Sequence, residues 1–170
     1  LSGRYRVLKS KASYNNIFGL CLTLFEMNSS HEAAVLEVGT NHFGEIGHLA
    51  SIASADIAVI TNIGFGHLES FGDRRGVFSE KISLLDKLRD GGTALLNGDD
   101  DMLSSVRSDK HRIIFYGTGD NCEMRLEDIR SVPGGVEFKL NGEKLFFNGE
   151  GRHNAYNAAA AVSVAVQMGI

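Results

Sequence analysis

The chain has 170 residues, 43% of them hydrophobic and 22% charged, with a formal net charge of -4. This mixture is typical of one globular domain, and the acidic balance without a run of Lys and Arg argues against a general nucleic-acid-binding surface. The apolar runs are too short to span a membrane, and the first ten residues lack the apolar core of a signal peptide. Cys21 and Cys122 have no metal-ligand spacing, so we expect reduced thiols and a cytoplasmic protein.

Short apolar runs alternate with helical patterns through the first half of the chain. Strands are favoured where Val, Ile, Leu and Ala gather between turn-forming residues, and helices where apolar residues recur every three or four positions. We expect strands at 5–10, 33–39 and 56–62 and helices at 17–27, 45–54 and 74–89. The second and third of these strands are nearly continuous in apolar residues, which is typical of parallel strands covered on both faces.

The second half continues this alternation and then changes its pattern. We expect strands at 93–98 and 112–117, a helix at 100–108 and an alanine-rich helix from 153 onward. Three runs from residue 124 look like antiparallel strands joined by Pro-Gly-Gly and Asn-Gly-Glu turns. The predicted fold class is α/β: a mostly parallel sheet covered by helices over about 1–120 and 150–170, with a small antiparallel β appendage over about 121–149.

Polar residues follow the strands expected at 33–39 and 56–62. Ligands of open parallel sheets gather beyond the carboxyl ends of the strands. The candidates at these ends are Glu37, Asn41, His42, Thr61, Asn62 and His67. Glu37 lies within an apolar run, where an unpaired charge would be costly to bury, so either a metal ion or a pairing with Arg or backbone N–H groups is expected. His67, taken alone, is better explained as a loop histidine than as a metal ligand.

Other polar features have ordinary structural explanations. Lys81, taken alone, is best explained as a surface lysine beside Glu80. The carboxylates at 97–101 suggest a magnesium site, but Asp residues at a helix start cap free N–H groups, and we favour capping. Asn154 and Asn157 lie on one side of the first turns of a helix, where they suit either a planar base or a cap. No G-x-x-x-x-G-K-[ST] phosphate loop is present in these 170 residues.

Five blocks occur in one order along the chain. They are LEVGTNHFGEIGHLA at 36–50, DIAVITNIGFGHLESFG at 56–72, Lys81, ALLNGDD at 94–100 and GRHNAYNAAAA at 151–161. In these blocks the chain resembles the central, P-loop-NTPase-like ATP-binding domain of the Mur ligase family, over nearly its whole length. The stretch from Asn41 to Ile46 resembles most closely the branch that adds D-alanyl-D-alanine to UDP-N-acetylmuramoyl-tripeptide, rather than sibling branches or folylpolyglutamate synthase.

The resemblance implies an ATP-dependent ligase of peptidoglycan precursor synthesis. Such enzymes phosphorylate a carboxylate, and an amine then attacks the acyl phosphate to form an amide, so cations are needed against the phosphate charge. By resemblance, Glu37, His67 and Lys81 form the catalytic set, with Glu37 and His67 as Mg²⁺ ligands and Lys81 carbamylated into a carboxylate-like group at the metal. The resemblance also implies two further sets: ATP contacts at His153, Asn154 and Asn157, and muramoyl-peptide contacts at Ser13 to Asn16, Asn41, His42, Thr61 and Asn62.

The two ends of the sequence suggest that it is a piece of a longer protein. By resemblance, the phosphate loop, the UDP-binding N-terminal domain and the C-terminal domain would lie outside it, so we expect the isolated piece to be inactive and the parent to be a monomeric ligase. Two alternatives are a sibling ligase acting on another amino acid or on folate, and a binding module that has lost catalysis. The joint presence of Glu37, His67 and Lys81 argues against the module.

Overall fold

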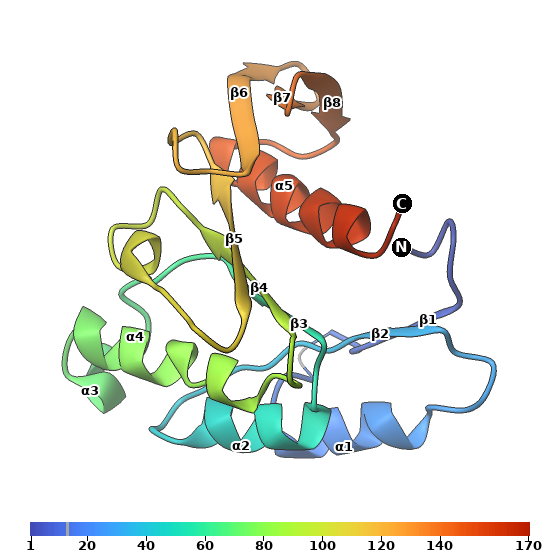
Figure 1. The fold of residues 1–170 in the computed structure, drawn as a ribbon, viewed down its shortest axis with the longest axis vertical. Helices are drawn as coiled ribbons and strands as arrows, with labels where there is room; N and C mark the ends of the chain where they lie inside the picture. The colour runs from blue at the N-terminus through green and yellow to red at the C-terminus, as the bar shows by residue number, and fades with distance from the viewer. Residues whose placement is uncertain (13) are drawn as a thin grey trace. The chain divides into compact units, whose positions relative to one another are not determined.

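A computed structural model describes residues 1–12 and 14–170. Ser13, which the resemblance assigns to the substrate-facing loop, lies outside the described residues. The chain divides into two compact units (Figure 1). The first comprises Leu1–Ala55, Gly64–Arg89 and Ile170, and the second comprises Asp56–Ile63 and Asp90–Gly169. No helix in the described part of the chain is long and apolar enough to cross a membrane.

The first unit consists of helices and one short two-stranded sheet. Strand β1 (Val7–Lys9) pairs in parallel with β2 (Ala33–Val35). The helical elements are α1 (Ile17–Phe25), α2 (Glu45–Ala53), α3 (Leu68–Phe71), α4 (Arg74–Ile82) and the 3-10 helix η1 (Leu85–Lys87). Helix α2 contacts α1, α4 and η1, so it lies at the centre of this unit. Its buried side chains Ile46, Leu49 and Ala50 face that core.

The second unit is built on one six-stranded sheet in the order β3-β4-β5-β6-β7-β8. Its strands are β3 (Ile57–Ile60), β4 (Thr93–Asn97), β5 (Arg112–Gly117), β6 (Met124–Val132), β7 (Gly135–Leu140) and β8 (Glu143–Phe147). Strands β3 to β6 are parallel neighbours, whereas β6, β7 and β8 pair antiparallel. The 3-10 helix η2 (Leu103–Ser105) and helix α5 (Arg152–Gln167) complete the unit.

Helix α5 packs on the sheet through its small residues. Ala155, Ala159 and Ala160 are buried in one core with Leu126 and Val136 of the strands. Positions four residues apart lie on one helix face, and alanine allows the helix backbone to approach the sheet closely. The alanine-rich run therefore encodes both the helix and its packing face.

The predicted fold class is confirmed. The parallel strands and the antiparallel extension occur as expected, and the Asn-Gly turn between β7 and β8 has positive φ at both Asn141 (49°) and Gly142 (86°), as hairpin turns of this kind require. The expected helix at 100–108 is wrong: only η2 forms there. The Asp100 side chain accepts the N–H groups of Met102 and Leu103 at 3.0 Å each, as a helix cap does, but the chain becomes extended at Val106 (φ -64°, ψ 134°) and the turn ends there.

Two other elements end several residues before their expected boundaries. The strand expected at 33–39 ends at Val35, which leaves Glu37 beyond the strand. The helix expected at 74–89 ends at Ile82, where the Ser83 hydroxyl donates to the Glu80 carbonyl at 2.6 Å and competes for an acceptor of the last turn. The short helix α3 was not predicted, because four residues are too few to show helical periodicity.

Asp99 links three segments of the second unit. Its carboxylate accepts the Thr118 and Gly119 N–H groups at 2.7 and 2.9 Å, the Thr118 hydroxyl at 2.8 Å and the Tyr156 hydroxyl at 2.7 Å. Burial by itself would raise the pKa of Asp99, but the hydrogen bonds outweigh it and hold the pKa below its usual value. The capping interpretation of this acidic cluster is thus confirmed for Asp100, which accepts two N–H groups at the start of η2. Asp99 also accepts backbone N–H groups, but those of the turn after β5.

Replacement of Asp99 by Asn is expected to loosen this turn in a pH-dependent way. A carboxyl group whose pKa is lower in the folded state than in the unfolded state stabilises the fold at pH values above its unfolded-state pKa. This stabilisation is lost as the pH falls through its folded-state pKa. At pH 7, amide exchange at Thr118 and Gly119 should be about tenfold faster in Asp99→Asn, and the difference should shrink below about pH 4. Asp120→Asn, which removes only an exposed contact to Arg125 at 3.1 Å, is the control and should change neither rate.

Candidate substrate pocket and nucleotide site

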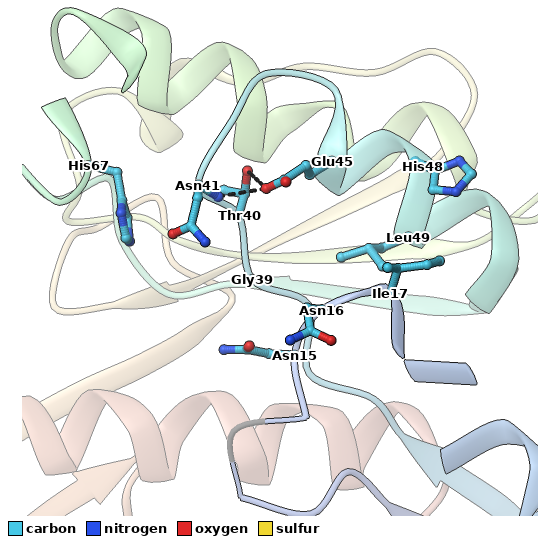
Figure 2. Close-up of a pocket in the computed structure, with 10 residues that line it drawn as sticks. All are labelled: Asn15, Asn16, Ile17, Gly39, Thr40, Asn41, Glu45, His48, Leu49 and His67. Atoms are coloured by element: carbon cyan, nitrogen blue, oxygen red, sulfur yellow. Dashed lines mark hydrogen bonds between the residues drawn. The ribbon is translucent and has the colours of Figure 1, made fainter. Parts of the chain in front are cut away.

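A pocket of about 530 Å³ lies entirely within the first unit (Figure 2). Three segments line it: the start of α1, the stretch from Gly39 into α2, and the loop before α3. Its lining residues are Asn15, Asn16, Ile17, Gly39, Thr40, Asn41, Glu45, His48, Leu49 and His67. Four predicted site residues, Asn15, Asn16, Asn41 and His67, therefore meet at one cavity.

The Asn15-Asn16 segment is fixed to the stretch that follows β2. The Gly39 N–H donates to the Asn15 carbonyl at 2.6 Å, and the Asn15 side-chain amide donates to a Glu37 carboxylate oxygen at 3.2 Å. Asn16 caps α1, because its side-chain oxygen accepts the Gly19 N–H at 3.0 Å. Asn16 thus has a structural role besides its place on the pocket wall.

Gly39 leaves the space that the Asn15 side chain occupies. A Cβ at Gly39 would lie 2.8 Å from Asn15 Nδ2 and 2.9 Å from its Cγ, closer than side chains tolerate. The Gly39 backbone is not left-handed, so the glycine is required for space rather than for conformation. The close approach explains why this position has no side chain.

Gly39→Ala is expected to displace Asn15 and weaken binding at the pocket. On the activity that the family resemblance implies, KM of the full-length protein for a muramoyl-peptide should rise about tenfold, while KM for ATP should stay within about twofold. Gly47→Ala is the matched control, because a Cβ there would meet only Ser83 Oγ at 3.5 Å, an ordinary contact. Equal kinetic effects of the two substitutions would contradict the spatial argument.

The carboxylate of Glu45 is hydrogen-bonded by the loop that precedes it, residues Thr40–Glu45. One carboxylate oxygen accepts the N–H groups of Asn41 at 2.7 Å and His42 at 3.1 Å, and it lies 3.2 Å from the Thr40 hydroxyl (Figure 2). The backbone N–H of Asn41, followed by that of His42, lowers the pKa of Glu45 against a small opposing effect of burial. The pocket wall therefore carries a charge that persists at neutral pH. In Figure 2 the Asn41 side chain extends from this loop toward the pocket.

Glu80 supports the same loop from outside the pocket. Its carboxylate is only 3% exposed and accepts the N–H groups of Gly44 and Ile46, each at 2.7 Å. The sequence did not predict Glu80, nor the pocket-lining residues Ile17, Gly39, Thr40, Glu45, His48 and Leu49. The sequence did contain one signal for Glu80. This residue directly precedes the candidate Lys81, and a carboxylate that faces the core must be paired with hydrogen-bond donors.

The premise that Glu37 is buried is wrong. Glu37 is exposed beyond the end of β2, and its contacts are the Asn15 amide on the side chain and Ser10 Oγ, which accepts the Glu37 N–H at 3.0 Å. His67 is also exposed, with φ 58° at the start of α3. Lys81 is half-buried on α4 in the same unit. Among the described residues, no group of three or more His, Cys, Asp and Glu side chains is arranged to hold a metal ion.

The remaining predicted residues divide between the units. His42 is exposed in the first unit and lies 3.5 Å from Glu45 through its Nδ1. Thr61 and Asn62 follow β3 and belong to the second unit, so they do not form part of the pocket. His153, Asn154 and Asn157 occupy the first turns of α5, also in the second unit, and the Asn154 amide donates to the Glu150 carbonyl at 2.7 Å. This contact ties α5 to the loop before it and is not a helix cap, because no side chain caps the start of α5.

The fold and the pocket define an α/β domain with polar loops after its strands, a class in which ligands bind beyond the carboxyl ends of the strands. The chain belongs to the Mur ligase family, whose middle domain matches residues 2–165. It is 37% identical over 172 residues to the UDP-N-acetylmuramoyl-tripeptide–D-alanyl-D-alanine ligase of Bacillus subtilis (strain 168), covering 100% of this chain and 37% of that protein. The Escherichia coli (strain K12) enzyme of the same name is 30% identical over 169 residues, covering 95% of this chain and 37% of that protein.

Solved structures agree with the sequence comparisons. MurF from Acinetobacter baumannii has a TM-score of 0.93 at 30% identity, covering 100% of this chain and 38% of the other. MurF from Thermotoga maritima in complex with ADP has a TM-score of 0.87 at 26% identity, covering 99% and 40%. The chain thus spans less than half the length of the relatives it matches.

Proposed function

We propose that the parent protein is an ATP-dependent ligase that joins D-alanyl-D-alanine to UDP-N-acetylmuramoyl-tripeptide through an acyl phosphate, in peptidoglycan precursor synthesis. The similarity to the B. subtilis ligase along the whole chain carries this proposal, together with the high structural similarity to MurF. The parent is proposed to act as a cytoplasmic monomer without nucleic-acid or membrane partners.

The pocket of the first unit is the proposed muramoyl-peptide site. Its wall offers amide donors and acceptors from Asn15, Asn16 and Asn41, which match the amides and hydroxyls of a sugar-linked peptide. Its apolar side, Ile17 and Leu49, suits the aliphatic parts of such a substrate. Thr61 and Asn62, exposed after β3, and His42, exposed beside Glu45, are proposed to contribute further substrate contacts.

The first turns of α5 are the proposed adenine site. His153 and Asn157 are exposed there, and Asn154 is half-buried, so amide and imidazole groups are available to a planar base. The relative from T. maritima, whose structure is a complex with ADP, supports a nucleotide site in this family. ATP is accordingly proposed as the phosphoryl donor.

The donor groups of the first unit suit a bound Mg²⁺. This ion prefers oxygen ligands and takes one or two carboxylates together with water and substrate phosphates, so it does not need a cage of three protein ligands. Glu37 offers an exposed carboxylate, and a carbamylated Lys81 would add a second carboxylate-like group in the same unit. When bound, Mg²⁺ would offset the charge that develops on the transferred phosphoryl group. Glu37, His67 and Lys81 are thus the proposed catalytic set.

The decisive experiment measures phosphate release by the full-length parent with ATP, Mg²⁺ and UDP-N-acetylmuramoyl-tripeptide, with and without D-alanyl-D-alanine. We expect release that depends on the dipeptide. If single amino acids or a folate substrate drive release instead, the parent is a sibling ligase. If no acceptor drives release, the non-catalytic binding module replaces the ligase.

A further inference from the structure

Glu80 on α4 is the one carboxylate that is buried in the described part of the chain, with 3% of its surface exposed. A charged group in this position requires donors, because burial without them is strongly unfavourable. Its location near the C-terminal end of α4 supplies none, since the partial charge of that helix end is negative. The donors come from another segment.

Those donors are backbone groups at the start of α2. The Gly44 N–H donates to one oxygen of Glu80 and the Ile46 N–H to the other, each at 2.7 Å, and the Thr40 hydroxyl lies 3.3 Å from the second oxygen. Gly44 is the N-cap of this nine-residue helix and has no side chain to cap it, with φ 89°. Glu80 therefore supplies the cap that the sequence at Gly44 lacks, and it complements the positive end of α2.

We propose that Glu80 is a positioning residue for the muramoyl-peptide pocket, and this inference rests on the proposed function. Glu80 does not line the pocket and acts through the Thr40–Ile46 segment. Glu45 holds the front of that loop by binding the Asn41 and His42 N–H groups, and Glu80 holds its rear. The two carboxylates thus hold the loop from which the Asn41 side chain extends toward the pocket (Figure 2).

The same contact ties the loop to α4, the helix that carries Lys81 as the next residue. A shift of the loop would break two short hydrogen bonds to Glu80, so these bonds hold the loop to α4. Ile46 and Leu49 are buried apolar side chains, and a substitution at Glu80 leaves their apolar surface unchanged. Loss of Glu80 should therefore affect the loop more than the helix behind it.

Glu80→Gln in the full-length parent tests the proposal. Gln keeps the volume but presents an NH₂ group to one of the two N–H donors, so one hydrogen bond becomes a repulsive contact. We expect KM for UDP-N-acetylmuramoyl-tripeptide to rise about tenfold, with KM for ATP within about twofold of the wild-type value. Amide exchange at Gly44 and Ile46 should accelerate about tenfold. Glu80→Asp keeps the charge, so its KM and its amide-exchange rates should lie between those of the wild type and those of Glu80→Gln. Glu80→Asp is the variant to measure if Glu80→Gln does not fold.

Val77→Ala is the matched control, because Val77 is 4% exposed on the same helix one turn earlier. It should lower the melting temperature without changing the ratio of the two KM values. If Glu80→Gln raises both KM values together, or only as much as Val77→Ala, Glu80 is a stabilising residue and the proposal is overturned. Wild-type parent without dipeptide-dependent phosphate release overturns the proposed function itself, whereas an active wild type with unaltered Glu80→Gln kinetics overturns only the role of Glu80.

Discussion

Lys81→Ala is expected to lower turnover of the parent enzyme by about 100-fold or more, with much smaller changes in KM for either substrate. Lys81 is half-buried on α4, directly after the buried Glu80, in the unit that contains the pocket. A carbamylated lysine would carry a negative group in place of its positive charge and would help to orient Mg²⁺ at the phosphate. Alanine removes both the amine and the group built on it, so a loss confined to the chemical step is expected.

The rescue experiment separates this role from a loss of stability. A small carboxylate such as acetate, or bicarbonate, should partly restore turnover of Lys81→Ala, because either supplies the missing anionic oxygens. Lys87→Ala is the control, since Lys87 is an exposed lysine in η1, six residues further along the same unit. Steady-state phosphate release measures all three proteins. Unchanged turnover in Lys81→Ala would remove this lysine from the catalytic set.

The fold was largely predictable because its strands and helices follow local pattern. The strand at Arg112–Gly117 and the one at Met124–Val132 agree with expectation, since apolar periodicity and turn residues define both ends. The helix expected at 100–108 has a cap at its start, where Asp100 accepts two backbone N–H groups, but it ends after one 3-10 turn because the chain is extended at Val106. Apolar periodicity did not indicate this early end.

The site was predictable only in part. The amides Asn15, Asn16 and Asn41 were recognised as candidates and line one pocket, but Glu45, His48 and Glu80 were not recognised. The importance of Glu45 and Glu80 depends on which backbone groups they reach, and Glu80 reaches a loop 34 to 36 residues away in sequence. Glu37 was judged from its apolar neighbours, yet the strand ends two residues before it and leaves its side chain exposed. The end of a strand is the least certain boundary to read from sequence.

Glu37→Gln is expected to raise the Mg²⁺ concentration required for half-maximal turnover by about tenfold. The substitution is nearly isosteric, and the remaining amide oxygen can still accept the hydrogen bond that the Asn15 side chain donates to Glu37 at 3.2 Å. The pocket wall is thereby kept, and the change is limited to one negative charge. Turnover at saturating ATP, measured across a range of Mg²⁺ concentrations, gives the shift directly.

Glu32→Gln provides the comparison that makes this result specific. Glu32 is an exposed carboxylate in the same unit, five residues before Glu37, and its contacts are to Arg6: a 2.9 Å hydrogen bond from the Arg6 N–H and a 3.5 Å ion pair. Both variants remove one unit of negative charge from the region around β2, so a general electrostatic effect on metal or nucleotide affinity would appear in both. A shift confined to Glu37→Gln would mean that the ion is bound at this carboxylate, whereas equal curves would exclude Glu37 as a ligand. Glu37 is exposed, and within the described residues its hydrogen bonds are to Asn15 and Ser10, so Glu37→Gln should change metal affinity with little effect on folding. In one titration, the midpoint reports metal affinity, and turnover at saturating Mg²⁺ reports the amount of folded enzyme.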